Sequence, residues 1–107
     1  MLWQHDQISG VVDWVETSWG PAWLDVSHAA TYLAMLHDAD AATRFMTACR
    51  RRSGGPIDED RYWTVMDIVG YLPTPAKVAT PWRDCGLDIS DTLAQRRLEE
   101  WLTQVLA

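Results

Sequence analysis

The stretch WLDVSHAATYLAMLH, residues 23–37, is predicted to form the central helix of the fold. Its apolar residues fall on nearly all sides of a helix with about 3.6 residues per turn, a pattern typical of a buried central helix. Two ionisable residues, Asp25 and His28, interrupt it on adjacent turns of one side. A buried charge has to be hydrogen-bonded, so the placement of these two residues requires a structural or functional reason.

A second helix is predicted over 38–53. Asp38 or Asp40 lies at its start, where a carboxylate caps free backbone N–H groups. It ends in the arginine run 50–52, and the Ser-Gly-Gly-Pro that follows is a strong stop signal. Arginines at this end compensate the helix dipole, so we interpret the run as solvated charge rather than as a site for phosphate or an acidic partner.

Two more helices are predicted, over 58–72 and 90–106. The first carries one apolar stripe at helical spacing, made of Tyr62, Val65, Met66, Val69 and Leu72. The second begins at the cap Ser90, and its inner face consists of Ala94, Leu98, Trp101, Leu102 and Val105. Between the two helices, 73–89 contains three prolines and is predicted to be an irregular connector anchored by Trp82.

Residues 1–14 are predicted to form a β-hairpin. Leu2 and Trp3 precede a polar turn at 5–7, and a β-branched run follows from Ile8. The predicted fold is therefore mainly α with a short N-terminal β-hairpin, in a single domain over 1–107. The seven tryptophans indicate a packed interior, since each can bury roughly 150–250 Å².

Composition narrows the class of partner. A formal net charge of −6 disfavours nucleic acid, because phosphate binding needs clustered Lys and Arg. No apolar run approaches the ~20 residues of a membrane span, and the first residues lack the charge and apolar stretch of a signal peptide. We therefore expect a cytoplasmic protein without a membrane partner. Cys49 and Cys85 lack zinc or redox spacing and are expected to be free thiols.

Asp13 is the first candidate for chemistry. It directly follows the apolar residues Val11 and Val12, where a strand would leave its sheet. A carboxylate held there on rigid backbone can ligate a magnesium ion that bridges nucleotide phosphates. An aspartate after a strand is also a common turn or capping residue, and spacing alone leaves both interpretations open.

With its surroundings, Asp13 resembles the metal-binding aspartate of the aminoglycoside phosphotransferase family, which is related in fold to protein kinases. Three pieces match in order and spacing: the hairpin leading to Ile8-Ser9-Gly10-Val11-Val12-Asp13-Trp14, the loop Ser18-Trp19-Gly20-Pro21, and the helix start Leu24-Asp25-Val26-Ser27-His28. The resemblance, weaker toward the last helix, implies the helical C-lobe of a kinase-like fold. It also implies that Asp13 holds Mg²⁺ against ATP, like the aspartate of the kinase Asp-Phe-Gly motif, and that Asp25 braces the catalytic loop.

The sequence departs from the family pattern ahead of the hairpin. The family's catalytic loop, His-Gly-Asp-x-x-x-x-Asn, would stand just before Met1, and neither it nor the nucleotide-binding lobe is present. We therefore expect the C-terminal portion of an enzyme that phosphorylates a small-molecule hydroxyl. Alone it is expected to be inactive and to bind Mg²⁺ and ATP at most weakly, because phosphoryl transfer needs metal sites, a base and phosphate contacts together.

Further residues leave alternatives open. Acidic side chains near the third helix could attract a cationic sugar, although three of them, as a cluster at a helix start, also have a structural reason to be there; the four are Asp58, Glu59, Asp60 and Asp67. His28 is interpreted as a satisfied core or interface histidine. A small-molecule binder is a third possibility, using the tryptophans Trp19, Trp23, Trp63 and Trp82, although such residues more often pack in a core or at its rim.

The main alternative to an enzyme piece is a stand-alone helical interaction or dimerisation domain. An isolated hairpin is marginally stable unless it is packed against something. The central helix would also expose the surface that meets the catalytic loop in the family, and exposed apolar patches mark association sites. If the chain folds alone, we expect a homodimer or a larger homo-oligomer.

Overall fold

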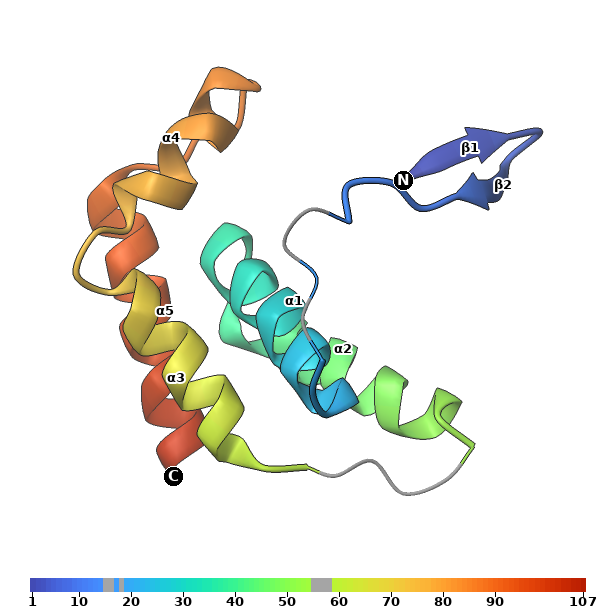
Figure 1. The fold of residues 1–107 in the computed structure, drawn as a ribbon. Coiled ribbons are helices and arrows are strands. Elements are labelled where there is room, and N and C mark those ends of the chain that lie inside the picture. Colours follow the sequence, from blue (N-terminus) through green and yellow to red (C-terminus); the bar gives the residue numbers. More distant parts are fainter. Residues whose placement is uncertain (15–16, 18, 55–58) are drawn as a thin grey trace.

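The computed structural model of the protein describes residues 1–14, 17, 19–54 and 59–107. Within these residues the chain is mainly helical, with five helices and a two-stranded antiparallel hairpin at the N-terminus. The predicted mainly α class with an N-terminal hairpin is confirmed at this level. Figure 1 shows the helices packed together and the hairpin projecting away from them.

The central helix is α1 (Ala22–Leu36), within one residue of the helix predicted over 23–37. It contacts three of the other four helices. Its buried face carries small side chains, with Ala30 and Ala34 fully buried, and small contact residues let neighbouring helices approach closely. The helix is not enclosed on all sides, however, because Asp25 and His28 lie on an exposed side.

The second helix, α2 (Ala39–Arg52), begins at the N-cap Asp38, whose carboxylate accepts a hydrogen bond from the backbone N of Ala41 at 2.6 Å. It packs along α1 through the buried side chains of Ala42 and Met46. The helix ends before Gly54, which has a positive φ of 68° that glycine adopts without steric cost.

The third helix, α3 (Arg61–Tyr71), is capped by Asp60, which accepts from the backbone N of Tyr62 at 2.9 Å. Asp58, where the sequence predicts its start, lies outside the described residues. The buried face consists of Thr64 and Ile68, whereas the expected apolar stripe is largely solvent-exposed: Tyr62, Met66 and Val69 are 46–53% exposed. Helical spacing identified a stripe but not the side of α3 that meets the core.

The last helix, α5 (Asp91–Leu106), begins at Ser90, whose hydroxyl accepts from the backbone N of Leu93 at 3.0 Å. It buries Ala94, Leu98 and Trp101, the first part of the predicted inner face. It also secures the end of α1, because Arg97 donates to the backbone carbonyls of Met35 and Leu36 at 3.2 and 3.0 Å. These are among the carbonyls that a helix end leaves without an internal partner.

A fifth helix, α4 (Ala76–Asp84), occupies part of the segment 73–89. The prediction of an irregular connector is therefore wrong. Pro75 stands at the N-cap, where a proline is compatible with a helix start, and Pro81 lies inside the helix at the loss of one backbone donor.

Burial compensates for the missing donor in α4. Val78 and Ala79 are buried, and α4 contacts α5. Arg83 fastens the end of the helix by donating to the carbonyl of Ile89 at 2.9 Å. Trp82, which the sequence suggested as the anchor, is 39% exposed.

The hairpin consists of β1 (Leu2–Gln4) and β2 (Gln7–Gly10), paired antiparallel. Its two-residue turn is formed by His5 and Asp6, both with positive φ, as a type I′ turn requires. The observed turn is one residue shorter than predicted, because Gln7 already belongs to the second strand.

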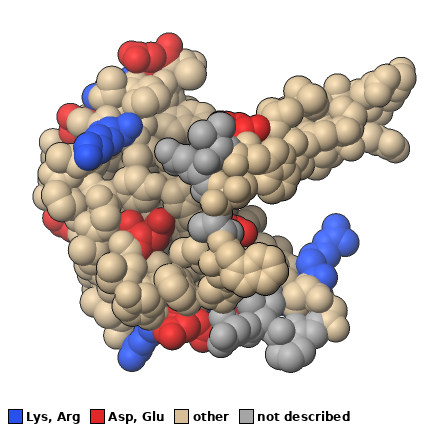
Figure 2. Space-filling model, viewed as in Figure 1, with Lys and Arg blue, Asp and Glu red and all other residues tan. Residues whose placement is uncertain are grey.

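We call residues 1–14 the N-terminal arm. Its large apolar side chains are between 48% and 66% exposed: Met1, Leu2, Trp3, Ile8, Val11, Val12 and Trp14. Figure 2 shows an arm whose visible face is almost entirely uncharged. Of the tryptophans, which the sequence took as a sign of a packed interior, Trp23 and Trp101 are buried in the core and the others are exposed or half-buried.

Two further expectations concern the cysteines and the absence of a membrane-spanning helix. Cys49 is half-buried and Cys85 is exposed, and both are free thiols, as predicted. No helix in the described ranges is long and apolar enough to cross a membrane.

The packing of α5 leads to a stability prediction. Leu98 is fully buried, so Leu98→Ala should lower the free energy of unfolding by about 2–5 kcal/mol. Leu106→Ala is the matched control on the same helix, because Leu106 is 56% exposed, and we expect a change within about 0.5 kcal/mol. Urea denaturation followed by circular dichroism measures both, and equal losses would contradict the orientation of α5.

Candidate functional site

Asp13 lies where the N-terminal arm ends, in a left-handed backbone conformation with a φ of 69°. Aspartate adopts this region more readily than most residues, and strained backbone is concentrated at functional sites. Neighbouring side chains hold the turn: the indole N–H of Trp14 donates to the carbonyl of Val11 at 2.9 Å, and the hydroxyl of Thr17 donates to the carbonyl of Trp14 at 3.0 Å. The Asp13 carboxylate is exposed and has no hydrogen-bond partner among the described residues.

Asp25 lies in the first turn of α1 and is exposed. It has no hydrogen bond or ion pair within the described part of the chain. The sequence led us to expect a buried, hydrogen-bonded carboxylate, and this expectation is wrong because Asp25 faces solvent. A carboxylate in a first turn is favoured by the helix dipole, so its position has a structural explanation, and its role as a brace stays a prediction.

The described residues do not form a metal site by themselves. They contain no group of three or more His, Cys, Asp or Glu side chains arranged to hold an ion. Mg²⁺ is usually bound through one or two carboxylates together with substrate phosphates. Asp13 could therefore contribute one ligand to such a site, and the other ligands would have to come from groups outside the described residues.

His28 and Asp67 form the clearest polar pair between α1 and α3. His28 Nδ1 lies 2.8 Å from Asp67 Oδ1, with the histidine side chain 51% exposed and the aspartate 16% exposed. The rings of Tyr32 and Tyr71 flank the imidazole at centroid distances of 5.0 and 6.1 Å. Asp67 thus acts as a bridge between helices and is not open to a cationic substrate in this conformation.

The pair changes the ionisation of its members. The hydrogen bond that His28 donates to the Asp67 carboxylate raises the pKa of His28 above its ordinary value, burial opposes this increase, and the charges of Asp67 and Asp25 add to it. Burial raises the pKa of the Tyr71 hydroxyl, and Tyr32 and Asp67 contribute in the same direction. At neutral pH, Tyr71 is therefore a neutral hydrogen-bonding group, and His28 is more readily protonated than a free histidine.

The other acidic candidates lie elsewhere. Glu59 accepts a hydrogen bond from Arg50 Nε at 2.7 Å, and the Arg50 guanidinium stacks 5.1 Å from the centroid of the Trp23 ring. Asp58 lies outside the described residues. The structure thus places Glu59 beside α2 and Asp67 against α1, and it does not bring Glu59, Asp67 and Asp13 into one described cluster.

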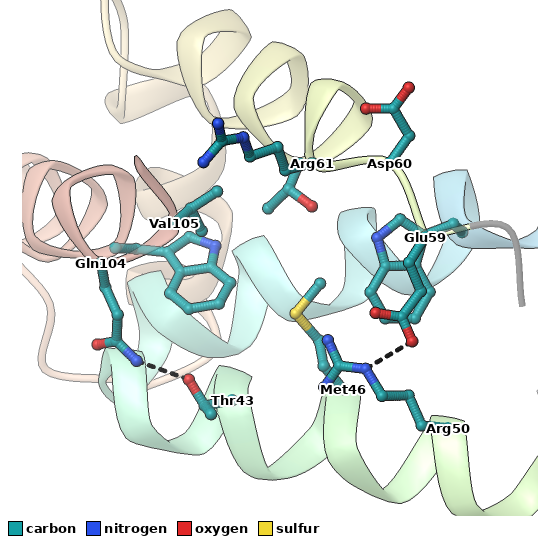
Figure 3. A pocket seen from close by; sticks show the side chains of 11 residues that line it. Thr43, Met46, Arg50, Glu59, Asp60, Arg61, Gln104 and Val105 are labelled. Carbon is teal, nitrogen blue, oxygen red and sulfur yellow. Dashed lines mark hydrogen bonds and ion pairs between the residues drawn. The ribbon is translucent and has the colours of Figure 1, made fainter. Parts of the chain in front are cut away.

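A pocket of about 550 Å³ opens beside Glu59, between α1, α2, the start of α3 and α5 (Figure 3). We call it the α2–α5 pocket. Among the residues that line it are Trp23, Met46, Arg50, Arg61, Trp101 and Gln104. Its volume lies within the range of about 300–1,000 Å³ that small-molecule sites occupy.

Comparison with known proteins gives no match to a protein family, to a curated sequence or to a solved structure. A relationship to aminoglycoside phosphotransferases therefore stays a prediction from the sequence motifs around Asp13. What the chain can do chemically follows from the geometry of its own side chains.

Sequence reasoning missed the two features with the most specific geometry, the His28–Asp67 pair and the α2–α5 pocket. Both join residues from helices that are far apart in the chain. The only early signal was that His28 interrupts an apolar helix, which indicated that it needs a partner without identifying one. Which helices meet is decided by packing, and single-sequence periodicity does not report it.

The His28–Asp67 pair leads to a pH prediction. A folded-state pKa above the ordinary value of about 6.5 means that the interaction stabilises the fold fully below that pH, and the stabilisation is lost as the pH rises through the folded-state pKa. NMR titration of the His28 ring should give the raised pKa, and Asp67→Asn should lower it. Asp25→Asn, which removes a charge that makes no hydrogen bond to His28, should lower the pKa less; equal effects would contradict the direct pairing.

Proposed function

We propose that this chain is the C-terminal helical part of an ATP-dependent small-molecule phosphotransferase of the aminoglycoside phosphotransferase type. The observation that carries the proposal is the free carboxylate of Asp13, placed at a left-handed turn between an antiparallel hairpin and the central helix α1. In the resemblance, this position belongs to the aspartate that holds Mg²⁺ against ATP. The acceptor would be a small molecule with a hydroxyl group.

The exposed surfaces support the same proposal. The N-terminal arm presents apolar side chains that no described helix covers, and the rest of a larger enzyme would cover them. Asp25 lies on the exposed side of α1, where its carboxylate could accept backbone N–H groups from a catalytic loop.

Within these 107 residues, Asp13 would supply one ligand for the metal that neutralises charge on the transferred phosphoryl group. The base that activates the acceptor and the second metal ligand belong, in the resemblance, to the catalytic loop. Because these groups act together, one carboxylate without the others should not support turnover. The proposal therefore requires partner groups outside this chain segment.

The coding sequence upstream of Met1 provides the first test. We expect an in-frame His-Gly-Asp-x-x-x-x-Asn there, and the longer protein should transfer phosphate from ATP to a hydroxyl-bearing substrate. In that protein Asp13→Asn should lower turnover by at least about 100-fold, because it removes a metal ligand. Asp6→Asn is the matched control, since Asp6 is also an exposed aspartate with positive φ. An upstream stop codon would reject the proposal.

The 107-residue chain alone is expected to be inactive. Purified protein should be incubated with ATP, Mg²⁺ and a panel of aminoglycosides, and phosphate transfer measured. Turnover above that of the Asp13→Asn variant would show that the chain needs no further groups, contrary to the proposal.

A second candidate function, association with a second copy through the N-terminal arm, is favoured by the exposure of that arm. Each strand of its hairpin has one unpaired edge within the described part of the chain, where β1 and β2 pair only with each other. Unpaired edges with apolar side chains are templates for pairing with another chain, and two identical edges can meet around a twofold axis. In this case the chain would act as an interaction domain.

Light scattering tests the second candidate. We expect a dimer that Ile8→Asp dissociates, because Ile8 lies opposite Trp3 in the hairpin and is 55% exposed. Met66→Asp is the control, since Met66 is similarly exposed but lies on α3. A wild-type monomer rejects association, and dissociation by Met66→Asp alone would move the interface to α3.

A further inference from the structure

The α2–α5 pocket has a polar lining in which most groups already satisfy one another. Arg50 pairs with Glu59 at 2.7 Å, and Gln104 donates to the hydroxyl of Thr43 at 2.7 Å. Both interactions are drawn in Figure 3. These groups shape the pocket, and they do not require a ligand.

Two donors in the lining have no acceptor. Trp101 is 97% buried, and its indole N–H has no hydrogen-bond partner among the described residues. Arg61 is exposed and makes no hydrogen bond or ion pair within the same part of the chain. Figure 3 shows Arg61 extending from the start of α3 toward the side of the pocket where Val105 lies.

The neighbouring carboxylate does not neutralise Arg61. Asp60 caps α3 by accepting from the backbone N of Tyr62, and in Figure 3 its carboxylate points away from the Arg61 guanidinium. Among the described residues, these two side chains of the lining, whose donors lack an acceptor, are therefore a cation and a neutral N–H donor, and both call for an acceptor. A buried donor without a partner is uncommon in native structures and requires an explanation.

We propose that the α2–α5 pocket binds a small organic carboxylate with a flat apolar body. The carboxylate would accept from the guanidinium of Arg61 and from the indole N–H of Trp101. The apolar body would pack against the half-buried Val105, which lines the same pocket together with the nearly fully buried Trp23 and Met46. A carboxylate matches the two donors because its two oxygens can accept from both at once.

Reaching the indole nitrogen takes a small movement, because the nitrogen is covered by its neighbours. Arg61 and Gln104 are exposed lining side chains, and exposed side chains change rotamer on a picosecond to nanosecond scale. A ligand whose carboxylate reaches the indole N–H gains a hydrogen bond that the indole otherwise lacks among the described residues. The pocket should therefore favour an acceptor over a purely apolar molecule of the same size.

NMR of the full chain tests the proposal with benzoate and 1-naphthoate as probes. The indole N–H signal of Trp101, identified by its loss in Trp101→Phe, should shift on titration with a Kd below about 1 mM. Arg61→Gln should weaken binding at least about tenfold, because it removes a charge-assisted hydrogen bond. Benzamide has the same ring without the charge, and it should bind at least about tenfold more weakly than benzoate.

Arg96→Gln is the control variant, because Arg96 is an exposed arginine on α5 that does not line the pocket; it should leave binding unchanged. An unmoved Trp101 signal, or equal affinity in Arg61→Gln, would overturn the proposal. The site uses none of the residues on which the phosphotransferase proposal depends, so either can fail without the other.

Discussion

The hydrogen bond between the hydroxyls of Ser27 and Thr64, 2.8 Å long and buried, fixes how α3 lies on α1. A buried hydroxyl without a partner costs about 1–3 kcal/mol, so the orientation of α3 that lets each hydroxyl satisfy the other is strongly favoured. That orientation places Ile68 in the core and brings Asp67 to His28. It also turns Met66 outward. This polar contact thereby acts together with the burial of Ile68 to favour the orientation in which Asp67 is shared between two helices.

Much of the secondary structure could be predicted, because its signals are local. The caps Asp38 and Ser90 and the hairpin at the N-terminus follow from residues within a few positions of each other. The buried side of α3 could not be predicted in the same way. Hydrophobicity alone favours burial of the stripe that includes Met66. The structure instead buries Thr64, whose hydroxyl bonds to that of Ser27 on α1, 37 residues earlier in the sequence.

The segment from Pro75 to Pro81 shows a second limit of local rules. Prolines disfavour a helix because each lacks a backbone donor, so an irregular connector was predicted over 73–89. The helix forms because Val78 and Ala79 become buried and Arg83 fastens its end to Ile89. These tertiary contacts outweigh a propensity that is only a weak prior.

In the candidate site, too, local features could be predicted from the sequence and tertiary contacts could not. Asp13 could be selected from the sequence, because an aspartate after an apolar strand is a local pattern and the resemblance gave it a role. The partners of two other acidic candidates could not be selected, because each partner lies on another element: Arg50 holds Glu59, and His28 holds Asp67. An acidic residue counted from the sequence as open to a cationic ligand thus becomes part of the scaffold once its partner is known.

Pairing also decides where ligands of each charge can bind. Once Glu59 and Asp67 are engaged, Asp13 is a carboxylate free of hydrogen bonds and ion pairs among the described residues, and it lies at the end of the N-terminal arm. Among the described residues, Arg61 makes no hydrogen bond or ion pair, and it lines the α2–α5 pocket together with Trp101, whose buried indole N–H lacks a partner. A cation is favoured at the first position and an anion at the second, because opposite charges attract and the pocket carboxylates Glu59 and Asp60 bond to other groups. The net charge of −6 says little about either position, since recognition depends on the few groups that folding leaves unpaired.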